Sequence, residues 1–275
     1  MGIEHCSDEK QRYMALRLRM FDGGYARLDS TWNMRDVCSP YTRLYYVYDG
    51  EGWVNSPSGE HKLRAGRMYL IPSGLKFDYR CDDRLDKLYM HVVLEMPDGF
   101  DMLGSFGDVL EMDMPEGLGT EILAAHRGQD MASAFRMKGC VMDTIAQFME
   151  AYGAGLMPIS SYSPLISAAF RLIKRDLSSR LTLKEIADAL DINPSTLGKR
   201  FRAETGASVS DYIDSLLMQK LQRRLLSSDA TLAEISDELG FCDQFYMSRY
   251  FKKRQHETPS AYRRRLGGAV YVCSF

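Results

Sequence analysis

Long apolar segments are missing from this chain of 275 residues. A candidate membrane helix needs about 18 or more consecutive apolar residues, and no such run occurs. The opening residues, Met1 to His5, also lack the charged and apolar regions of a signal peptide. These absences disfavour a membrane-embedded protein, and we expect a soluble, cytoplasmic protein with no membrane partner.

Metal-ligand clusters are missing as well. The cysteines at positions 6, 38, 81, 140, 242 and 273 never form a C-x-x-C pair, which disfavours a zinc site or a disulfide framework. We expect reduced thiols, with a redox switch at Cys242 as an open alternative. The histidines, at positions 5, 61, 91, 126 and 256, include no two within one strand's length. We therefore predict no metal, no cofactor and no catalytic residue.

Charge is unevenly shared along the chain, although the net charge is only −2. From Leu165 onward there are 18 Lys and Arg against 13 Asp and Glu, whereas the preceding residues hold 17 against 24. A chain of this length suits about two domains. The basic C-terminal part is the candidate for nucleic-acid binding, because phosphate contacts dominate that affinity.

The C-terminal part contains one pattern twice. The sequence L-x-x-I-A-x-x-L at 183–190 recurs 49 residues later as L-x-x-I-S-x-x-L at 232–239. Each copy begins with a Thr-x-x-Glu capping box, which satisfies free amides in the first turn of a helix. A predicted turn follows at 191–193 or 240–242, and then a second helix, over 194–204 or about 243–254. This order predicts two helix-turn-helix units.

The second helix of each unit has an inward and an outward side. Leu197 and Phe201 are the expected anchors of the first, and Met247 and Phe251 those of the second. The outward positions are predicted to read base edges: Ser195, Thr196, Lys199, Gln244, Phe245, Ser248 and Arg249. Nearby cations are predicted phosphate contacts: Arg200, Arg202, Lys252, Lys253, Arg254, Arg263 and Arg264. The alternative is an ordinary solvated face, which the repetition of caps, turns and anchors disfavours.

Residues 165–265 resemble the DNA-binding domain of the AraC/XylS family of transcriptional regulators. The resemblance rests on these residues: Leu183, Ile186, Ala187, Leu190, Phe201, Glu204, Thr205, Gly206, Tyr212, Ile235, Leu239, Gly240, Phe241, Phe245, Ser248, Arg249, Phe251, Lys252 and 258–264. It implies a long joining helix over 209–226 and two second helices that enter successive major-groove segments on one face of promoter DNA. Gly198 departs from the family pattern where a base-reading side chain is frequent, and His256 replaces a frequent turn glycine.

The N-terminal half shows the periodicity of strands. Short segments such as 43–48, 53–55, 68–71, 77–80 and 88–94 are separated by Gly, Pro, Asn, Asp and Ser turns. This spacing predicts an antiparallel sandwich or barrel. The stretch Gly50-x-Gly52, followed by Leu63 to Gly74, is similar to the cupin-like sensor domains attached to the AraC/XylS family.

A small barrel can hold one ligand in its interior. Alternation places Tyr45 and Asp49 on one face of an early strand, and Lys87, Tyr89 and His91 on one face of the last. We predict that these five residues line a ligand pocket. One alternative is that they simply fill the barrel. Another is a metal-dependent cupin enzyme, which the scarcity of histidine disfavours.

Residues 115–155 return to helical spacing. Their apolar positions form one predicted stripe: Ala134, Phe135, Val141, Met142, Ile145, Phe148, Met149 and Tyr152. In the resembling family a helix here often pairs subunits, and the alternative is packing on the chain's own barrel. The predicted domains are therefore a cupin-like sensor at 1–110, a helical linker and dimerisation region at 111–162, and the tandem helix-turn-helix domain at 163–266.

These observations predict a multi-domain chain, β followed by all-α: a cupin-like antiparallel barrel, a helical linker, and two helix-turn-helix units joined by a long helix. The predicted function is a sequence-specific transcriptional regulator, an activator and not an enzyme, controlled by a small molecule in the barrel. The expected partners are double-stranded promoter DNA, a sugar or other metabolite, RNA polymerase and a second copy of the chain. A regulator whose filled barrel only dimerises stays open, as does a metal-dependent cupin enzyme fused to a DNA-binding module.

Overall fold

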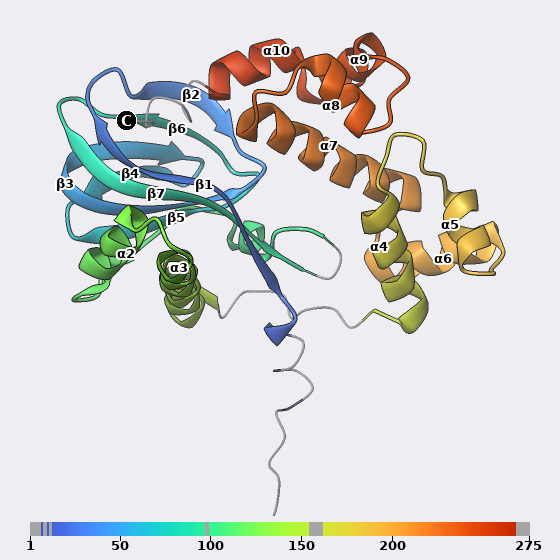
Figure 1. Ribbon diagram of the computed structural model, residues 1–275, viewed down its shortest axis with the longest axis horizontal. Helices are drawn as coiled ribbons and strands as arrows, with labels where there is room; N and C mark the ends of the chain where they lie inside the picture. Colours follow the sequence, from blue (N-terminus) through green and yellow to red (C-terminus); the bar gives the residue numbers. More distant parts are fainter. Residues whose placement is uncertain (1–6, 8–9, 11–12, 97–98, 154–161, 268–275) are drawn as a thin grey trace, which may run out of the picture. The chain divides into compact units, whose positions relative to one another are not determined.

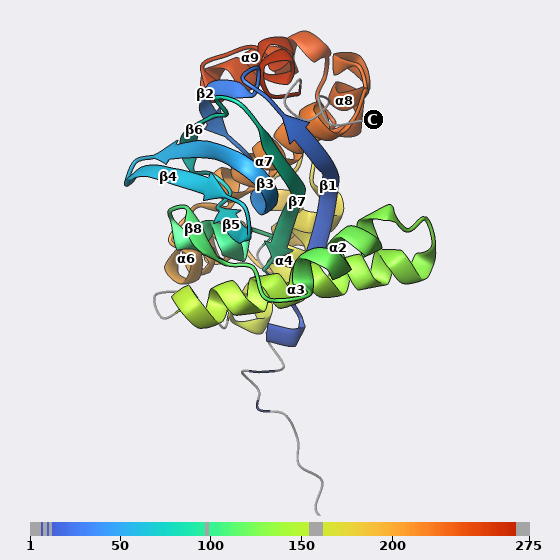
Figure 2. The same cartoon turned by 90° about the vertical axis from the view of Figure 1, so that its left-hand side faces the viewer.

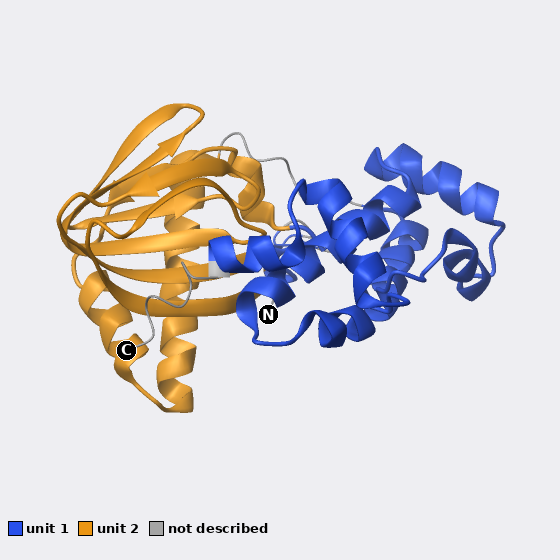
Figure 3. Cartoon of the chain, turned by 90° about the horizontal axis from the view of Figure 1, so that it is seen from above, with its two compact units in different colours: residues 1–16, 95–100, 159–270 blue, residues 17–94, 101–158, 271–275 orange. Residues whose placement is uncertain are grey.

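The computed structural model describes residues 7, 10, 13–96, 99–153 and 162–267. They fall into two compact units, each described by itself (Figure 3). The β-unit holds residues 17–94 and 101–153. The helical unit holds residues 162–267, together with the described residues of segment 95–100 and of the chain before Arg17. The helices over 118–152, predicted as a separate linker, therefore belong to the β-unit.

A sheet of eight strands forms the framework of the β-unit (Figure 1). The strands are β1 (Arg17–Leu28), β2 (Asn33–Cys38), β3 (Thr42–Ser56), β4 (Gly59–Arg64), β5 (Arg67–Ile71), β6 (Lys76–Arg80), β7 (Leu85–Glu95) and β8 (Leu110–Asp113). One layer has the order β1-β7-β3-β5-β8, and in the other β3 pairs with β4 and β6, and β6 with β2. The predicted antiparallel architecture is confirmed.

The long strand β3 belongs to both layers. Its first part pairs with β5 and β7, and its second part pairs with β4 and β6. The change of layer follows a register shift between Val47 and Asp49. Gly50 adopts a φ of 71° directly after it, and a Cβ there would collide with the carbonyl oxygen of Arg84. Glycine is required at this bend because it tolerates both the left-handed backbone and the close approach.

Two helices cover the outer face of the first layer, α2 (Leu118–Arg127) and α3 (Met131–Tyr152), as Figure 2 shows. The Tyr46 hydroxyl lies 2.9 Å from the Thr144 hydroxyl on α3, and the Tyr48 hydroxyl donates to the carbonyl of Gly119 on α2 at 2.7 Å. Since side chains alternate along a strand, Arg43, Tyr45 and Val47 point the other way, into the interior between the layers. Packing on the chain's own sheet is thus observed for α3.

The helical unit consists of short helices around one long one. They are α4 (Pro164–Asp176), α5 (Leu183–Ala189), α6 (Pro194–Thr205), α7 (Val209–Ser227), α8 (Leu232–Glu238), α9 (Gln244–Gln255), α10 (Pro259–Tyr262) and the π-helical turn η3 (Arg263–Gly267). The predicted starts are confirmed, since both capping boxes form and Asn193 accepts from the Ser195 amide. The predicted joining helix is α7, which buries an apolar side that includes Leu216, Leu217 and Leu221.

An aromatic cluster fills the core of the first helix-turn-helix unit. The ring of Phe170 lies 5.5 Å from Phe201 and 5.0 Å from Tyr212, measured between centroids. Segment 95–100 joins this core, because the ring of Phe100 lies 5.6 Å from Tyr212 and the Lys174 ammonium donates to the Glu95 carboxylate at 2.7 Å. Sequence reasoning did not assign this segment to the helical unit.

Candidate nucleic-acid interface and ligand site

The second helices α6 and α9 are held by the predicted anchors. Leu197 and Phe201 on α6, and Met247 and Phe251 on α9, are all fully buried. Each helix therefore presents its opposite side outward. The prediction that the anchors share one buried side is confirmed for both units.

The predicted base-reading residues lie on the outward sides of α6 and α9. Ser195, Thr196 and Lys199 are exposed on α6. Phe245 on α9 is 67% exposed, an unusual state for a phenylalanine, and Arg249 is exposed one turn later. Gln244 and Ser248 are half-buried, and the Ser248 hydroxyl donates to the Gln244 carbonyl at 2.7 Å. Contact of these residues with bases stays a prediction.

Sequence reasoning missed Tyr246 on α9. Its side chain is 46% exposed, and the Arg249 guanidinium lies 6.0 Å from the centre of its ring. It borders a groove of about 460 Å³ between α9 and α7, whose lining also includes Lys253 and Arg254. The position of Tyr246 in the sequence could have indicated this role, since it lies three residues after the N-cap Asp243, in the first turn of the helix that was predicted to enter DNA.

The predicted phosphate contacts divide into two groups. Arg200, Arg202, Lys252, Lys253 and Arg264 are exposed on the surface of the helical unit. Arg254, which is also exposed, and Arg263, which is half-buried, have charged or carbonyl partners inside the chain. The first five cations are therefore the better candidates for phosphate binding, which requires an accessible charge.

Arg254 and Arg263 are engaged within the helical unit. The Arg254 guanidinium pairs with the Asp214 carboxylate at 2.5 Å and lies 3.7 Å from the ring centre of Tyr250. Arg263 is half-buried and donates to the carbonyls of Leu225 and Ala230 at 2.9 and 2.7 Å. The bond to Leu225 caps the last turn of α7, and the bond to Ala230 holds the loop that follows it, so Arg263 has a structural role, and its contact with phosphate stays a prediction.

The interior of the β-unit brings together four of the five predicted ligand residues. Strand pairing sets Tyr45 opposite Tyr89 and places Lys87 and His91 at alternate positions on the same strand. All four are buried. The Lys87 ammonium lies 3.3 Å from the ring centre of Tyr45 and 3.9 Å from that of Trp32. Ligand binding by these residues stays a prediction, because the same contacts would also fill the interior.

Asp49, the fifth predicted ligand residue, lies elsewhere. The register shift after Val47 breaks the alternation, and the Asp49 side chain is 59% exposed and pairs with Arg84 at 3.1 Å. The prediction that it shares the face of Tyr45 is therefore wrong. The physical reason is the bulge, which no periodic pattern reveals.

Arg43 is the interior residue that sequence reasoning missed. It is only 4% exposed and pairs across the strands with His91. Nearby, the hydroxyl of Tyr41 is buried without a hydrogen-bond partner among the described residues, and the Nδ1 of His91 faces the Oδ2 of Asp22 at 3.4 Å. Burial, reinforced by the charge of Arg43, lowers the pKa of His91 to about 4, so its imidazole is neutral at pH 7. The interior position of Arg43 could have been predicted, since Arg43 lies two residues before Tyr45 and therefore on the same face of β3.

The described residues contain no group of three or more His, Cys, Asp and Glu side chains that could hold a metal ion. No disulfide joins any two of the described cysteines, Cys38, Cys81, Cys140 and Cys242. None of the described helices has the length and apolar character needed to cross a membrane.

The chain is similar to known proteins in both sequence and fold. Residues 172–265 match the family described as a helix-turn-helix domain. The uncharacterized transcriptional regulatory protein YesN of Bacillus subtilis is 40% identical over 111 residues, 39% of this chain and 30% of that protein, so this chain matches under one third of YesN. The Msm operon regulatory protein of Streptococcus mutans is 22% identical over 244 residues, 81% of this chain and 84% of that protein.

Residues 172–265 therefore form a helix-turn-helix domain that is similar to those of transcriptional regulators such as the arabinose operon regulatory protein of Escherichia coli, which is 25% identical over 227 residues, 78% of this chain and 77% of that protein. Among solved structures, ToxT of Vibrio cholerae with a bound unsaturated fatty acid aligns with this chain at a TM-score of 0.52 and 14% identity, covering 90% of this chain and 96% of that chain. At this identity the similarity establishes the fold. The predicted resemblance and the predicted order, a β domain followed by helices, are both confirmed for this chain.

Proposed function

We propose that this chain is a transcriptional regulator whose helical unit binds a specific promoter sequence by placing α6 and α9 in successive segments of the major groove. The observation that carries the proposal is the pair of matched units, each with fully buried anchors and an outward polar or basic side. A recognition helix needs this division, because its anchors fix its orientation while its free side meets base edges.

The test is a titration of the full-length chain onto DNA from upstream of its own gene, with random-sequence competitor, over about 50 to 200 mM salt. We expect preference for one site to survive the competitor, and affinity to fall by roughly a thousandfold across that range, because several exposed cations displace counterions from phosphates. Binding that competitor abolishes, with a shallow salt dependence, would instead indicate a protein-interaction module.

We further propose that a small molecule held inside the β-unit controls DNA binding. The support is the set of buried polar groups between the two layers, among which the Tyr41 hydroxyl lacks a hydrogen-bond partner among the described residues and Arg43 lacks a carboxylate partner there. Such groups are costly unless something satisfies them, and a polar ligand is one means. The ToxT structure was solved with a small molecule bound, and its fold covers most of this chain. Control requires that the ligand bind one conformational state more tightly than another.

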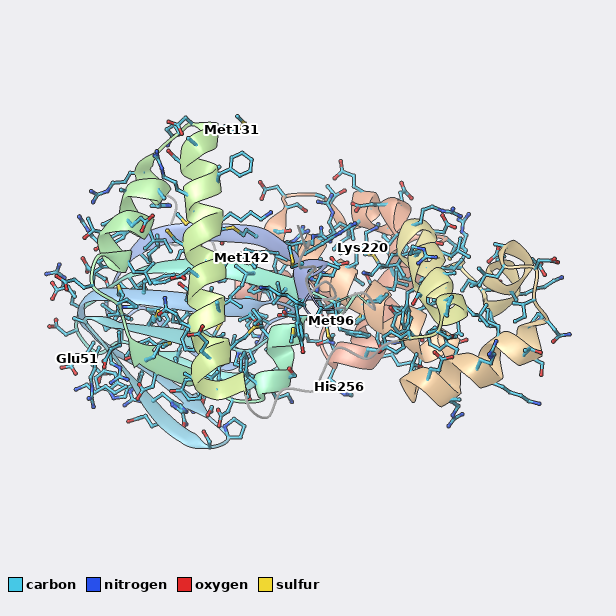
Figure 4. The ribbon with its side chains drawn as sticks, turned by 90° about the horizontal axis from the view of Figure 1, so that it is seen from below. Glu51, Met96, Met131, Met142, Lys220 and His256 are labelled. Atoms are coloured by element: carbon cyan, nitrogen blue, oxygen red, sulfur yellow. The ribbon has the colours of Figure 1, made fainter. Side chains whose placement is uncertain are left out.

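Pairing of two copies through α3 is a second proposal, and one observation favours it. The side of α3 that faces away from the sheet exposes Met131, Phe135 and Met142, which are 76%, 67% and 41% exposed (Figure 4). An apolar stripe at helical spacing is typical of a helix that packs against a partner. Transcriptional activation through contact with RNA polymerase stays a proposal that rests on the resemblance alone.

A further inference from the structure

The side chain of Arg43 is buried in the β-unit and is only 4% exposed. It donates three hydrogen bonds, two to the Ser39 hydroxyl at 3.0 and 2.8 Å and one to the Tyr45 hydroxyl at 3.4 Å. The rings of Tyr41 and Phe77 complete its surroundings, 5.7 and 5.5 Å from the guanidinium carbon. No carboxylate in the described part of the chain forms an ion pair with it.

A buried cation without a counter-charge is unfavourable. Arginine cannot escape by losing its proton, because its pKa is too high. Neutral hydroxyls take three of the guanidinium's five N–H groups and leave its charge uncompensated. A chain that keeps such a group at a site with no ion pair gains from it only when an anion arrives.

The surrounding side chains are suited to the body of an organic anion. Rings of Tyr41, Tyr45, Tyr89 and Trp32 gather at the interior, and Lys87 adds a second buried cation. His91, stacked on Tyr41 at 4.4 Å, is neutral at pH 7. The carboxylate of Asp22 lies 3.4 Å from the Nδ1 of His91, and its charge faces the imidazole without an ion pair to Arg43.

We propose that the interior of the β-unit binds an organic monocarboxylate with an aromatic or apolar body, its carboxylate held by the guanidinium of Arg43. The planar fork of arginine matches a carboxylate in a two-point hydrogen-bonded pair. The aromatic walls hold the body of the ligand, and the Tyr41 hydroxyl, which has no hydrogen-bond partner among the described residues, can bond a second polar group. The inference rests on the proposed ligand control and names the ligand class.

The experiment uses the full-length chain and matched probes that differ in charge. Benzoate, 4-hydroxybenzoate and hexanoate are compared with benzamide, 4-hydroxybenzamide and hexanamide by thermal shift and calorimetric titration. A ligand that binds only the native state raises the melting temperature by mass action. We expect at least one carboxylate to raise it, and its amide to bind roughly ten- to a hundredfold more weakly, since a charge-assisted hydrogen bond is lost.

Three variants test the role of Arg43. Arg43→Met should remove the carboxylate effect while leaving the melting temperature of the unliganded protein unchanged or higher, because a buried uncompensated charge is replaced by an apolar side chain. Arg43→Lys should weaken binding and keep a preference for carboxylate over amide. Arg64→Met, which removes an exposed cation from β4 of the same unit, should behave as the unaltered chain.

The outcomes separate this inference from the proposed function. Equal binding of amide and carboxylate, unchanged in Arg43→Met, would keep a ligand site and overturn the ligand class. A folded Arg43→Met protein with a much lower melting temperature and full carboxylate response would show that Arg43 only supports the fold. If no carboxylate of the panel binds, the class is overturned, and a screen of neutral metabolites, sugars included, then decides whether the β-unit binds a ligand at all.

Discussion

We expect neighbouring residues on α9 to make different kinds of contact with DNA. Arg249 lies on the outward side beside Phe245, where a guanidinium can meet a guanine edge, whereas Lys252 lies near the end of the helix among other cations. The two side chains have the same sign of charge but different geometry. A planar fork discriminates between bases, and an ammonium mainly neutralises phosphate.

Replacing each of these residues should therefore weaken binding in a different manner. Arg249→Ala should cost about 1–3 kcal/mol on the preferred site and relax preference at one base pair. Lys252→Ala should weaken binding to all sequences alike and reduce the slope of log affinity against log salt by about 1. Affinity measured for each variant on single-base-pair variants of the site, at two salt concentrations, checks both. Identical behaviour of the two variants would contradict the assignment of Arg249 to base reading.

The residue scale also shows what alternation can and cannot predict. Tyr45, Lys87, Tyr89 and His91 were correctly placed in the interior, because each lies in an uninterrupted run of a paired strand. Asp49 was misplaced by the bulge that follows Val47. Arg43 was overlooked because a charged side chain at an interior position violates the usual burial rule, and such a violation marks a functional position more often than a core position.

At the scale of elements, the sequence predicted best where local chemistry sets a boundary. The capping boxes at Thr182 and Thr231 correctly predicted the starts of α5 and α8. A side chain that accepts a hydrogen bond from a backbone amide of the first turn marks where a helix begins, which the spacing of apolar residues alone does not. Helix α3 was predicted less well. Its apolar positions were read as one stripe, whereas Val141, Ile145 and Phe148 pack on the sheet and Phe135 and Met142 are exposed.

That division of α3 makes a testable prediction about assembly. Replacing Met131 and Phe135 together by Ser should convert a dimer into a monomer without loss of thermal stability, because both side chains are already exposed in the single chain. Molar mass by light scattering over a concentration series checks this. Arg136→Ser, an exposed neighbour on the same helix, is the matched control and should leave the mass unchanged. A monomeric unaltered chain would contradict the pairing role of α3.

At the scale of the whole molecule, the distribution of charge along the chain predicted the division into two units better than the spacing of the predicted helices and strands did. The acidic N-terminal and basic C-terminal parts correspond closely to the β-unit and the helical unit. The exception is segment 95–100, which follows β7 yet belongs with the helical unit through Phe100 and Glu95. The placement of this segment in the helical unit depends on the packing of a few side chains that are distant in sequence, so no local sequence pattern predicts it.

The central claim is that both helix-turn-helix units meet DNA, and footprinting of the full-length chain tests it most directly. We expect two protected major-groove segments on one face of the DNA, about one helical turn or 10 base pairs apart. Arg249→Ala should weaken protection of one segment, and Lys199→Ala that of the other. A single protected segment, or protection that both variants reduce alike, would contradict the proposal that α6 and α9 read separate parts of the site.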